Sequence, residues 1–209
     1  MALRKYEDLN DIHLDVLREI GNIGSGNAAT SLSGMLEHPV YITVPKISIL
    51  DYAQVTQDLG GPETMIVGLL LQLGGDVTGM MMFLLHQGFA HMTLNALLGE
   101  DIQSFQEIDE MGYSAIKEVA NIMAASYVNA ISSMTGLTIQ ITPPDMTIDM
   151  LGSILSVPAI YYANISDKII FIEDEFGSED TKAPSHILMI PEVDSLGKIM
   201  TNLGIDFSE

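Results

Sequence analysis

Two long stretches of this chain place apolar residues every three or four positions, which predicts two amphipathic helices. The first helix is expected over residues 11–35, with Asn10 or Asp11 as its N-cap, and the second over residues 111–134. The apolar positions expected to be buried are Val16, Leu17, Ile20 and Ile23 in the first helix and Ile116, Val119, Ile122 and Met123 in the second. Burial of these sides leaves the opposite side of each helix facing solvent.

Shorter apolar segments predict strands and two further helices. The expected strands cover residues 40–44, with 46–50 as a candidate extension, 137–141, 154–163, 168–173 and 185–190. The further helices are expected over residues 89–98, where Gly99 ends the helix, and from residues 191–194 to Leu203-Gly204. The acidic run 173–180 is expected to be a solvated loop.

Residues 65–85 form the one segment with the length and apolar content of a membrane-spanning helix. Asp76 lies near its middle, and a central Asp costs roughly 2.5–3.5 kcal/mol on insertion scales. We therefore expect no membrane insertion, but a hairpin of two buried strands, 66–73 and 78–85, that turns at Gly74-Gly75-Asp76.

One polar pattern occurs twice, at positions 99 residues apart. Its members are Asp15, Glu19, Asn22 and Pro45 in the first copy and Ser114, Glu118, Asn121 and Pro144 in the second. At about 100° per residue, the first three members of each copy fall within roughly a 60° arc of a helix, opposite the apolar side. We call these faces the first stripe (Asp15, Glu19, Asn22) and the second stripe (Ser114, Glu118, Asn121).

The first predicted helix contains Gly21, Gly24 and Gly26, although glycine costs about 1 kcal/mol relative to alanine inside a helix. Two explanations are equally compatible with the sequence. Either the helix breaks near Gly24 and a loop begins, or the small residues clear room beside Glu19 and Asn22 so that another backbone can approach.

The repeat also organises the rest of the chain. Leu97-Leu98-Gly99 corresponds to Asn202-Leu203-Gly204 at a spacing of 105 residues. Each half is thus expected to contain a helix, a strand, a hairpin and a second helix. We predict an α+β fold in which duplicated halves, about 11–104 and 110–209, share one β-sheet with pseudo-twofold symmetry, so that residues 1–209 form a single domain.

Composition excludes several classes of function. The 8 Lys and Arg residues stand against 28 Asp and Glu residues, and a formal net charge of −20 would repel a nucleic-acid backbone. The chain has no cysteine, which excludes disulfides, zinc-thiolate sites and cysteine nucleophiles. Its first residues lack the apolar run of a secretory signal, so a cytoplasmic location is expected.

The residues do not predict a self-contained active site. Each stripe brings one or two carboxylates, too few for a hard cation, and we expect no metal site. The histidines, which show no paired ligand spacing, are assigned to packing or to the surface; they are His13, His38, His86, His91 and His186. Ser25 has no nearby histidine and no strand-to-helix turn of the kind a serine nucleophile needs.

An exposed carboxylate and amide on a fixed helix are suited to completing a site on another molecule. The Asn side chain both donates and accepts hydrogen bonds, and can orient a water for in-line attack on phosphorus. An ionised Glu can grip a lysine on that partner. The metal that neutralises the phosphate would then belong to the partner.

The repeated pattern resembles the signature of the CheC/CheX/FliY phosphatases of bacterial and archaeal chemotaxis, over nearly the whole chain. Two intact copies argue against CheX, and the absence of an extension after Glu209 argues against FliY, so the CheC branch is expected.

The resemblance implies hydrolysis of the aspartyl phosphate of the response regulator CheY (CheY-P), with no cofactor other than the Mg²⁺ that the regulator carries. It implies that Asn22 and Asn121 place the water and that Glu19 and Glu118 pair with the regulator's lysine. Pro45 and Pro144 are expected to be structural, and the difference between Asp15 and Ser114 argues against a shared chemical role. The resemblance also implies a second partner, the receptor deamidase CheD. The alternative is a non-catalytic module that docks CheY or controls CheD.

Overall fold

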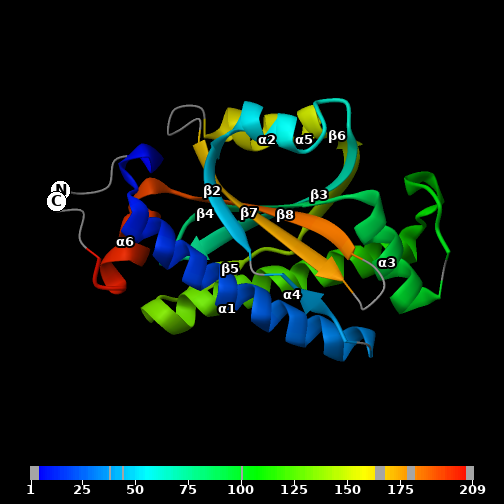
Figure 1. Cartoon of the computed structure of the whole chain (residues 1–209), viewed down its shortest axis with the longest axis horizontal. Coiled ribbons are helices and arrows are strands. Elements are labelled where there is room, and N and C mark those ends of the chain that lie inside the picture. Colours follow the sequence, from blue (N-terminus) through cyan, green and yellow to red (C-terminus); the bar gives the residue numbers. More distant parts are fainter. Residues whose placement is uncertain are drawn as a thin grey trace.

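One eight-stranded antiparallel sheet runs through the part of the chain that the computed structural model describes, residues 5–37, 39–43, 45–99, 101–162, 168–177 and 182–205 (Figure 1). Its strands are β1 (Tyr41–Ile42), β2 (Lys46–Asp51), β3 (Met65–Gly75), β4 (Gly79–Leu85), β5 (Ile139–Ile141), β6 (Asp145–Met150), β7 (Lys168–Gly177) and β8 (Lys182–Pro191). The strand order is β1-β7-β8-β4-β3-β5, while β2 also pairs with β7 and β6 with β3.

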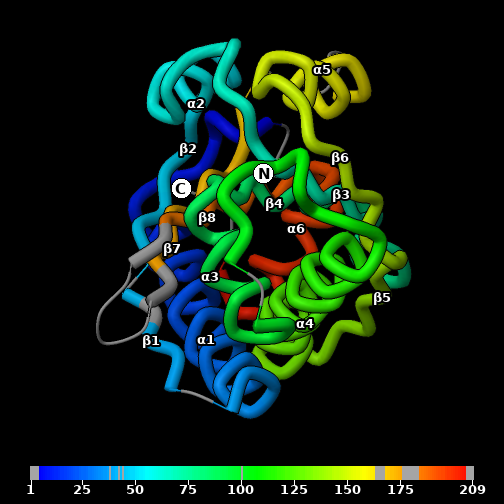
Figure 2. Tube along the Cα trace, turned by 90° about the vertical axis from the view of Figure 1, so that its right-hand side faces the viewer, coloured from blue at the N-terminus to red at the C-terminus, as the bar shows by residue number. Residues whose placement is uncertain are grey.

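Helices cover both faces of this sheet. On one face, α1 (Asp11–Leu36) and α4 (Glu110–Thr135) run side by side in opposite directions, flanked by α3 (Gln87–Leu98) and α6 (Val193–Asn202) (Figure 1). The other face carries α2 (Tyr52–Asp58) and α5 (Leu151–Tyr161), as the end-on view shows (Figure 2). Two short 3-10 helices, η1 (Tyr6–Asp8) and η2 (Phe105–Glu107), precede α1 and α4.

Strand β4 is apolar throughout because both of its faces are buried. Met81, Phe83 and Leu85 belong to the hydrophobic cluster under α1 and α4. Their neighbours Met80, Met82 and Leu84 belong to the cluster under α2 and α5. Because successive side chains of a strand point to opposite faces, a strand covered on both sides reads as a continuous apolar run. The predicted hairpin of β3 and β4 is confirmed, and no helix in the described ranges is long and apolar enough to cross a bilayer.

The two halves of the chain are interleaved in the sheet. Helix α4, strand β6 and helix α5 each begin 99 residues after their counterparts α1, β2 and α2. Strand β2 of the first half pairs with β7 of the second, and β6 of the second half pairs with β3 of the first. Strands β4 and β8 meet at the centre. The predicted fold class, an α+β fold with duplicated halves that share a sheet, is confirmed.

The expected boundaries of the long helices are close to those observed. Helix α1 begins after Asn10, whose side chain accepts hydrogen bonds from the backbone N–H groups of Ile12 and His13. Helices α3 and α4 end at Gly99 and Gly136, both in the left-handed conformation that glycine adopts without strain. The shorter connector helix α2 was not predicted.

The strand expected over residues 154–163 is wrong, because α5 occupies this segment. Its buried residues Leu151, Ile154, Leu155 and Pro158 follow the three- and four-residue spacing of a helix. The segment is so rich in apolar residues that a strand and a helix were both compatible with it. Residue 163 lies outside the described residues.

The solvated loop expected over residues 173–180 is also wrong where the structure describes it. Strand β7 continues to Gly177, and Asp174 is only 3% exposed. Residues 178–180 lie outside the described residues. The hairpin turn falls at residues 76–78, two residues beyond the expected position, since Gly74 and Gly75 still belong to β3. A Cβ on Gly75 would lie 2.5 Å from the Thr138 carbonyl oxygen, so this glycine permits the close approach of the chain that leads into β5.

Candidate functional site

The first stripe lies on the solvent side of α1. Asp15, Glu19 and Asn22 are all exposed, while Leu17 and Ile20 on the opposite side are 3% and 2% exposed. The buried side fixes the helix to the sheet, so the carboxylate of Glu19 and the amide of Asn22 are held outward one turn apart.

The second stripe has the same arrangement on α4. Ser114 and Glu118 are exposed and Asn121 is half-buried, while Ile116 and Val119 are buried in the core. Asp109 caps this helix by accepting a hydrogen bond from the Gly112 N–H at 2.9 Å, and it stands 99 residues after the cap of α1. Because α1 and α4 run in opposite directions, the two stripes lie toward opposite ends of the helix pair (Figure 1). The structure thus offers two separate Glu/Asn pairs.

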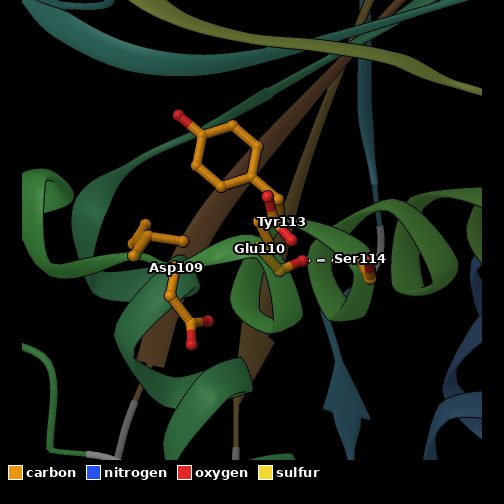
Figure 3. A pocket seen from close by; sticks show the side chains of 5 residues that line it. Asp109, Glu110, Tyr113 and Ser114 are labelled. Atoms are coloured by element: carbon orange, nitrogen blue, oxygen red, sulfur yellow. Dashed lines mark hydrogen bonds between the residues drawn. The ribbon is translucent and has the colours of Figure 1, made fainter.

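The first member of each stripe has a different local partner. Asp15 forms an ion pair with Arg18 on the surface of α1. Ser114 donates a hydrogen bond to the Glu110 carbonyl oxygen at 3.0 Å, inside its own helix. Ser114 also lines an open hollow at the start of α4, together with Ile108, Asp109, Glu110 and Tyr113 (Figure 3). The first position of the stripe thus has different surroundings in the two copies, and the absence of a shared chemical role stays a prediction.

Both prolines of the repeated pattern are buried, which supports the structural role expected of them. The Pro45 ring packs against Gly21 of α1, 3.3 Å from the point where a Cβ would lie, and Ile47 packs beside it. Gly21 directly precedes Asn22. The proline therefore supports the helix from beneath at the level of the candidate functional asparagine.

The glycines of α1 do not break the helix, which continues through Gly24 to Leu36. A Cβ on Gly24 would lie 2.6 Å from Cδ1 of Tyr127, so this glycine makes room for an aromatic ring of α4. Gly26 has open space around it. The predicted helix break is therefore wrong. The small residues do make room, but side chains of the same molecule fill it on the buried side at Gly21 and Gly24, so the expected approach of another backbone beside Glu19 and Asn22 is not what these two glycines accommodate.

Beneath the two helices lies a buried polar cluster that the sequence analysis did not identify. The Ser25 Oγ lies 2.7 Å from the Tyr127 hydroxyl and donates to the Asp174 carboxylate at 3.1 Å, and Tyr127 also donates to Asp174. Burial raises the pKa of Asp174 to about 6, against the opposing effect of the hydrogen bonds from Tyr127 and Ser25. Burial and the Asp174 charge raise the pKa of Tyr127 well above its usual range. Ser25 thus joins α1 to α4 and β7 through buried hydrogen bonds.

The two outward pairs are suited to a ligand carried by another molecule. An ionised Glu accepts hydrogen bonds, and an Asn both donates and accepts them, so each pair can bind a cation and orient a water within one helical turn. Within the described ranges, no three His, Asp or Glu side chains are grouped as metal ligands.

The two repeated segments match a known protein family. The CheC-like family matches residues 12–49 and 111–148, two segments at the same 99-residue spacing that contain both stripes and both prolines. The CheY-P phosphatase CheC of Bacillus subtilis is 29% identical over 206 residues, which is 95% of this chain and 97% of that protein.

Two further proteins extend this comparison. The flagellar motor switch phosphatase FliY of Bacillus subtilis is 27% identical over 141 residues, 67% of this chain and 36% of that longer protein. The crystal structure of FliY from Thermotoga maritima covers 94% of this chain and 98% of its own at a TM-score of 0.75 and 24% identity, which supports the fold. The resemblance inferred from the repeated pattern is confirmed.

Proposed function

We propose that this chain, two segments of which match the CheC-like family, hydrolyses the aspartyl phosphate of a CheY-type response regulator in the cytoplasm. The two Bacillus subtilis relatives are named as phosphatases, one of them for CheY-P, which supports a phosphatase role in chemotaxis. The observation that carries the proposal is the repeated Glu/Asn pair. Both copies lie within the family segments, and both are turned away from the core on fixed helices.

In the proposed reaction, Asn22 or Asn121 binds a water and aligns it with the phosphorus. The water oxygen attacks phosphorus, and the bond from phosphorus to the aspartyl oxygen of the regulator breaks. Inorganic phosphate and a free carboxylate are released, and the proton of the water passes to solvent or phosphate. Glu19 or Glu118 accepts a hydrogen bond from the regulator's lysine, and this contact fixes the position of the regulator relative to this chain. The Mg²⁺ expected on the regulator would supply the stabilisation of the phosphoryl charge.

The test is the loss of phosphate from a phosphorylated CheY-type receiver domain with Mg²⁺ present. The wild-type protein should accelerate this loss, and the double variant Asn22→Ala/Asn121→Ala should return it to the receiver's own rate, a fall of about 100-fold or more if water placement is lost at both sites. The control is Asn27→Ala/Asn129→Ala, which removes two exposed asparagines from the same helices outside the stripes. Unchanged phosphate loss in the first double variant would refute the catalytic role of the asparagines.

Docking without catalysis is the alternative proposal, and the resemblance adds control of CheD as a second task. If docking alone is the function, the stripes would bind the receiver, and the intact protein would not accelerate phosphate loss even when it saturates the receiver. Control of CheD is compatible with either catalysis or docking. Binding of purified CheD to the intact chain, measured in the same series, addresses the second task directly.

A further inference from the structure

One large apolar side chain stands exposed at the start of each stripe. Ile12 in the first turn of α1 is 61% exposed, and Met111 in the first turn of α4 is 62% exposed. The two positions are 99 residues apart, so they occupy the same place in the two halves.

A single exposed apolar residue needs no explanation in a folded protein, but a repeated one does. The other large apolar side chains that are strongly exposed in the described ranges are Tyr41, Met65, Met150, Val157, Ile160 and Tyr161. None of these six stands at the repeat position of another. Among the described residues, Ile12 and Met111 therefore form the one such pair related by the duplication, and they lie on the helices that carry the candidate site.

The pair also extends the stripes. Ile12 precedes Asp15 by three residues and Glu19 by seven, so it falls on the same side of α1, and all members from Ile12 to Asn22 lie within an arc of about 80°. Met111 holds the same place relative to Ser114 and Glu118. Each apolar residue follows an exposed acid, Asp11 or Glu110. On both helices, an approaching surface would meet an acid, an apolar side chain, the Glu and then the Asn.

We propose that Ile12 and Met111 are docking residues that anchor the phosphorylated receiver domain beside each Glu/Asn pair, an inference that rests on the proposed function. The partner surface would present an apolar patch next to its phosphorylated aspartate, rimmed by cations that face Asp11 or Glu110. Interfaces concentrate their binding energy in a few buried apolar anchors surrounded by polar contacts. The anchor holds the receiver, while the asparagine acts on the phosphoryl group.

This division of tasks predicts a separation of binding from turnover. The variant Ile12→Ser/Met111→Ser should raise the KM for the phosphorylated receiver about tenfold and leave kcat within about twofold, as expected when an interaction is equally strong in the ground and transition states. The control is Ile160→Ser, which removes a side chain that is 76% exposed on α5, across the sheet from the stripes. It should leave KM and kcat unchanged.

A binding measurement separates failure of this inference from failure of the proposed function. Calorimetry with the receiver domain held in its phosphorylated form by beryllofluoride should give a Kd about tenfold higher for the double variant than for the wild type. If the wild type binds but does not accelerate hydrolysis, the proposed function fails while this shift in Kd still supports docking. An unchanged Kd, no binding by the wild type, or an equal loss in the Ile160→Ser control would each overturn the inference.

Discussion

Burial beneath α1 and α4 raises the pKa of the Asp174 carboxyl to about 6, although Tyr127 and Ser25 donate hydrogen bonds to it. A carboxyl whose pKa is higher in the folded than in the unfolded chain holds its proton more tightly when folded. Its contribution to stability is therefore complete below pH 4 and is lost as pH rises through about 6. This rise in pKa corresponds to roughly 3 kcal/mol of stability lost at neutral pH.

The variant Asp174→Asn tests this effect, because its amide does not titrate in this range. The free energy of unfolding of the wild type minus that of the variant should fall by about 2 kcal/mol between pH 4 and pH 7. Taking the difference removes the contribution of His186, whose pKa burial lowers to about 4 and which therefore changes stability in the opposite direction. Denaturant unfolding at several pH values measures the difference. A difference that does not change with pH would show that Asp174 keeps an ordinary pKa.

The sequence of helix α1 is adapted to its packing against α4. Its glycine at position 24 accommodates the Tyr127 ring, and that ring carries the hydroxyl that bonds to Ser25 and Asp174. The contact therefore couples the packing of α1 on α4 to the buried cluster, and it holds both stripes in place.

Gly24→Ala should destabilise the protein by about 1–3 kcal/mol, because the new Cβ would overlap the Tyr127 ring and displace its hydroxyl. Gly34→Ala is the matched control on the same helix, where a Cβ meets open space. This control should be neutral or stabilising by up to about 1 kcal/mol, since alanine favours the helix. Thermal and denaturant unfolding compare the two variants. Equal stabilities of both would contradict the packing described for Gly24.

The elements predicted best from the sequence are the helices with one buried side and the hairpin whose strands are buried on both faces. Helices α1 and α4 carry a clear apolar side, and the hairpin of β3 and β4 is interrupted by Asp76. Helix α5 escaped prediction because its sequence is apolar at nearly every position, which hides the helical spacing. Asp174 was assigned to a loop because five acids crowd its neighbourhood, and only the tertiary contact with Tyr127 and Ser25 explains its burial.

Part of the candidate site was predictable because its residues occur in both copies of the repeat. A repeat exposes functional positions through their identity in both copies, so Glu19, Asn22, Glu118 and Asn121 could be selected without coordinates, although their roles remain predictions. Ile12 and Met111 also stand 99 residues apart, but they are not identical, so the repeat did not single them out. They were missed because an isoleucine and a methionine at the start of a helix are ordinarily read as packing residues, and their exposure is visible only in the fold.

At the scale of the whole molecule, the duplication places two equivalent sites on one interleaved framework. Strand β2 completes the second hairpin and β6 completes the first, so each stripe depends on both halves for its support. That residues 1–209 form one domain of two repeats, about 11–104 and 110–209, stays a prediction with which this interleaving agrees. The opposite directions of α1 and α4 keep the two sites apart, so that one should act when the other is lost (Figure 1).

The rate of phosphate loss from a phosphorylated receiver domain, compared among the wild type, Asn22→Ala, Asn121→Ala and the double variant, tests the central claim most directly. Two independent sites predict that the accelerations remaining in the single variants add up to that of the wild type, and that the double variant leaves only the receiver's own rate. A double variant that still accelerates phosphate loss as the wild type does would contradict the account.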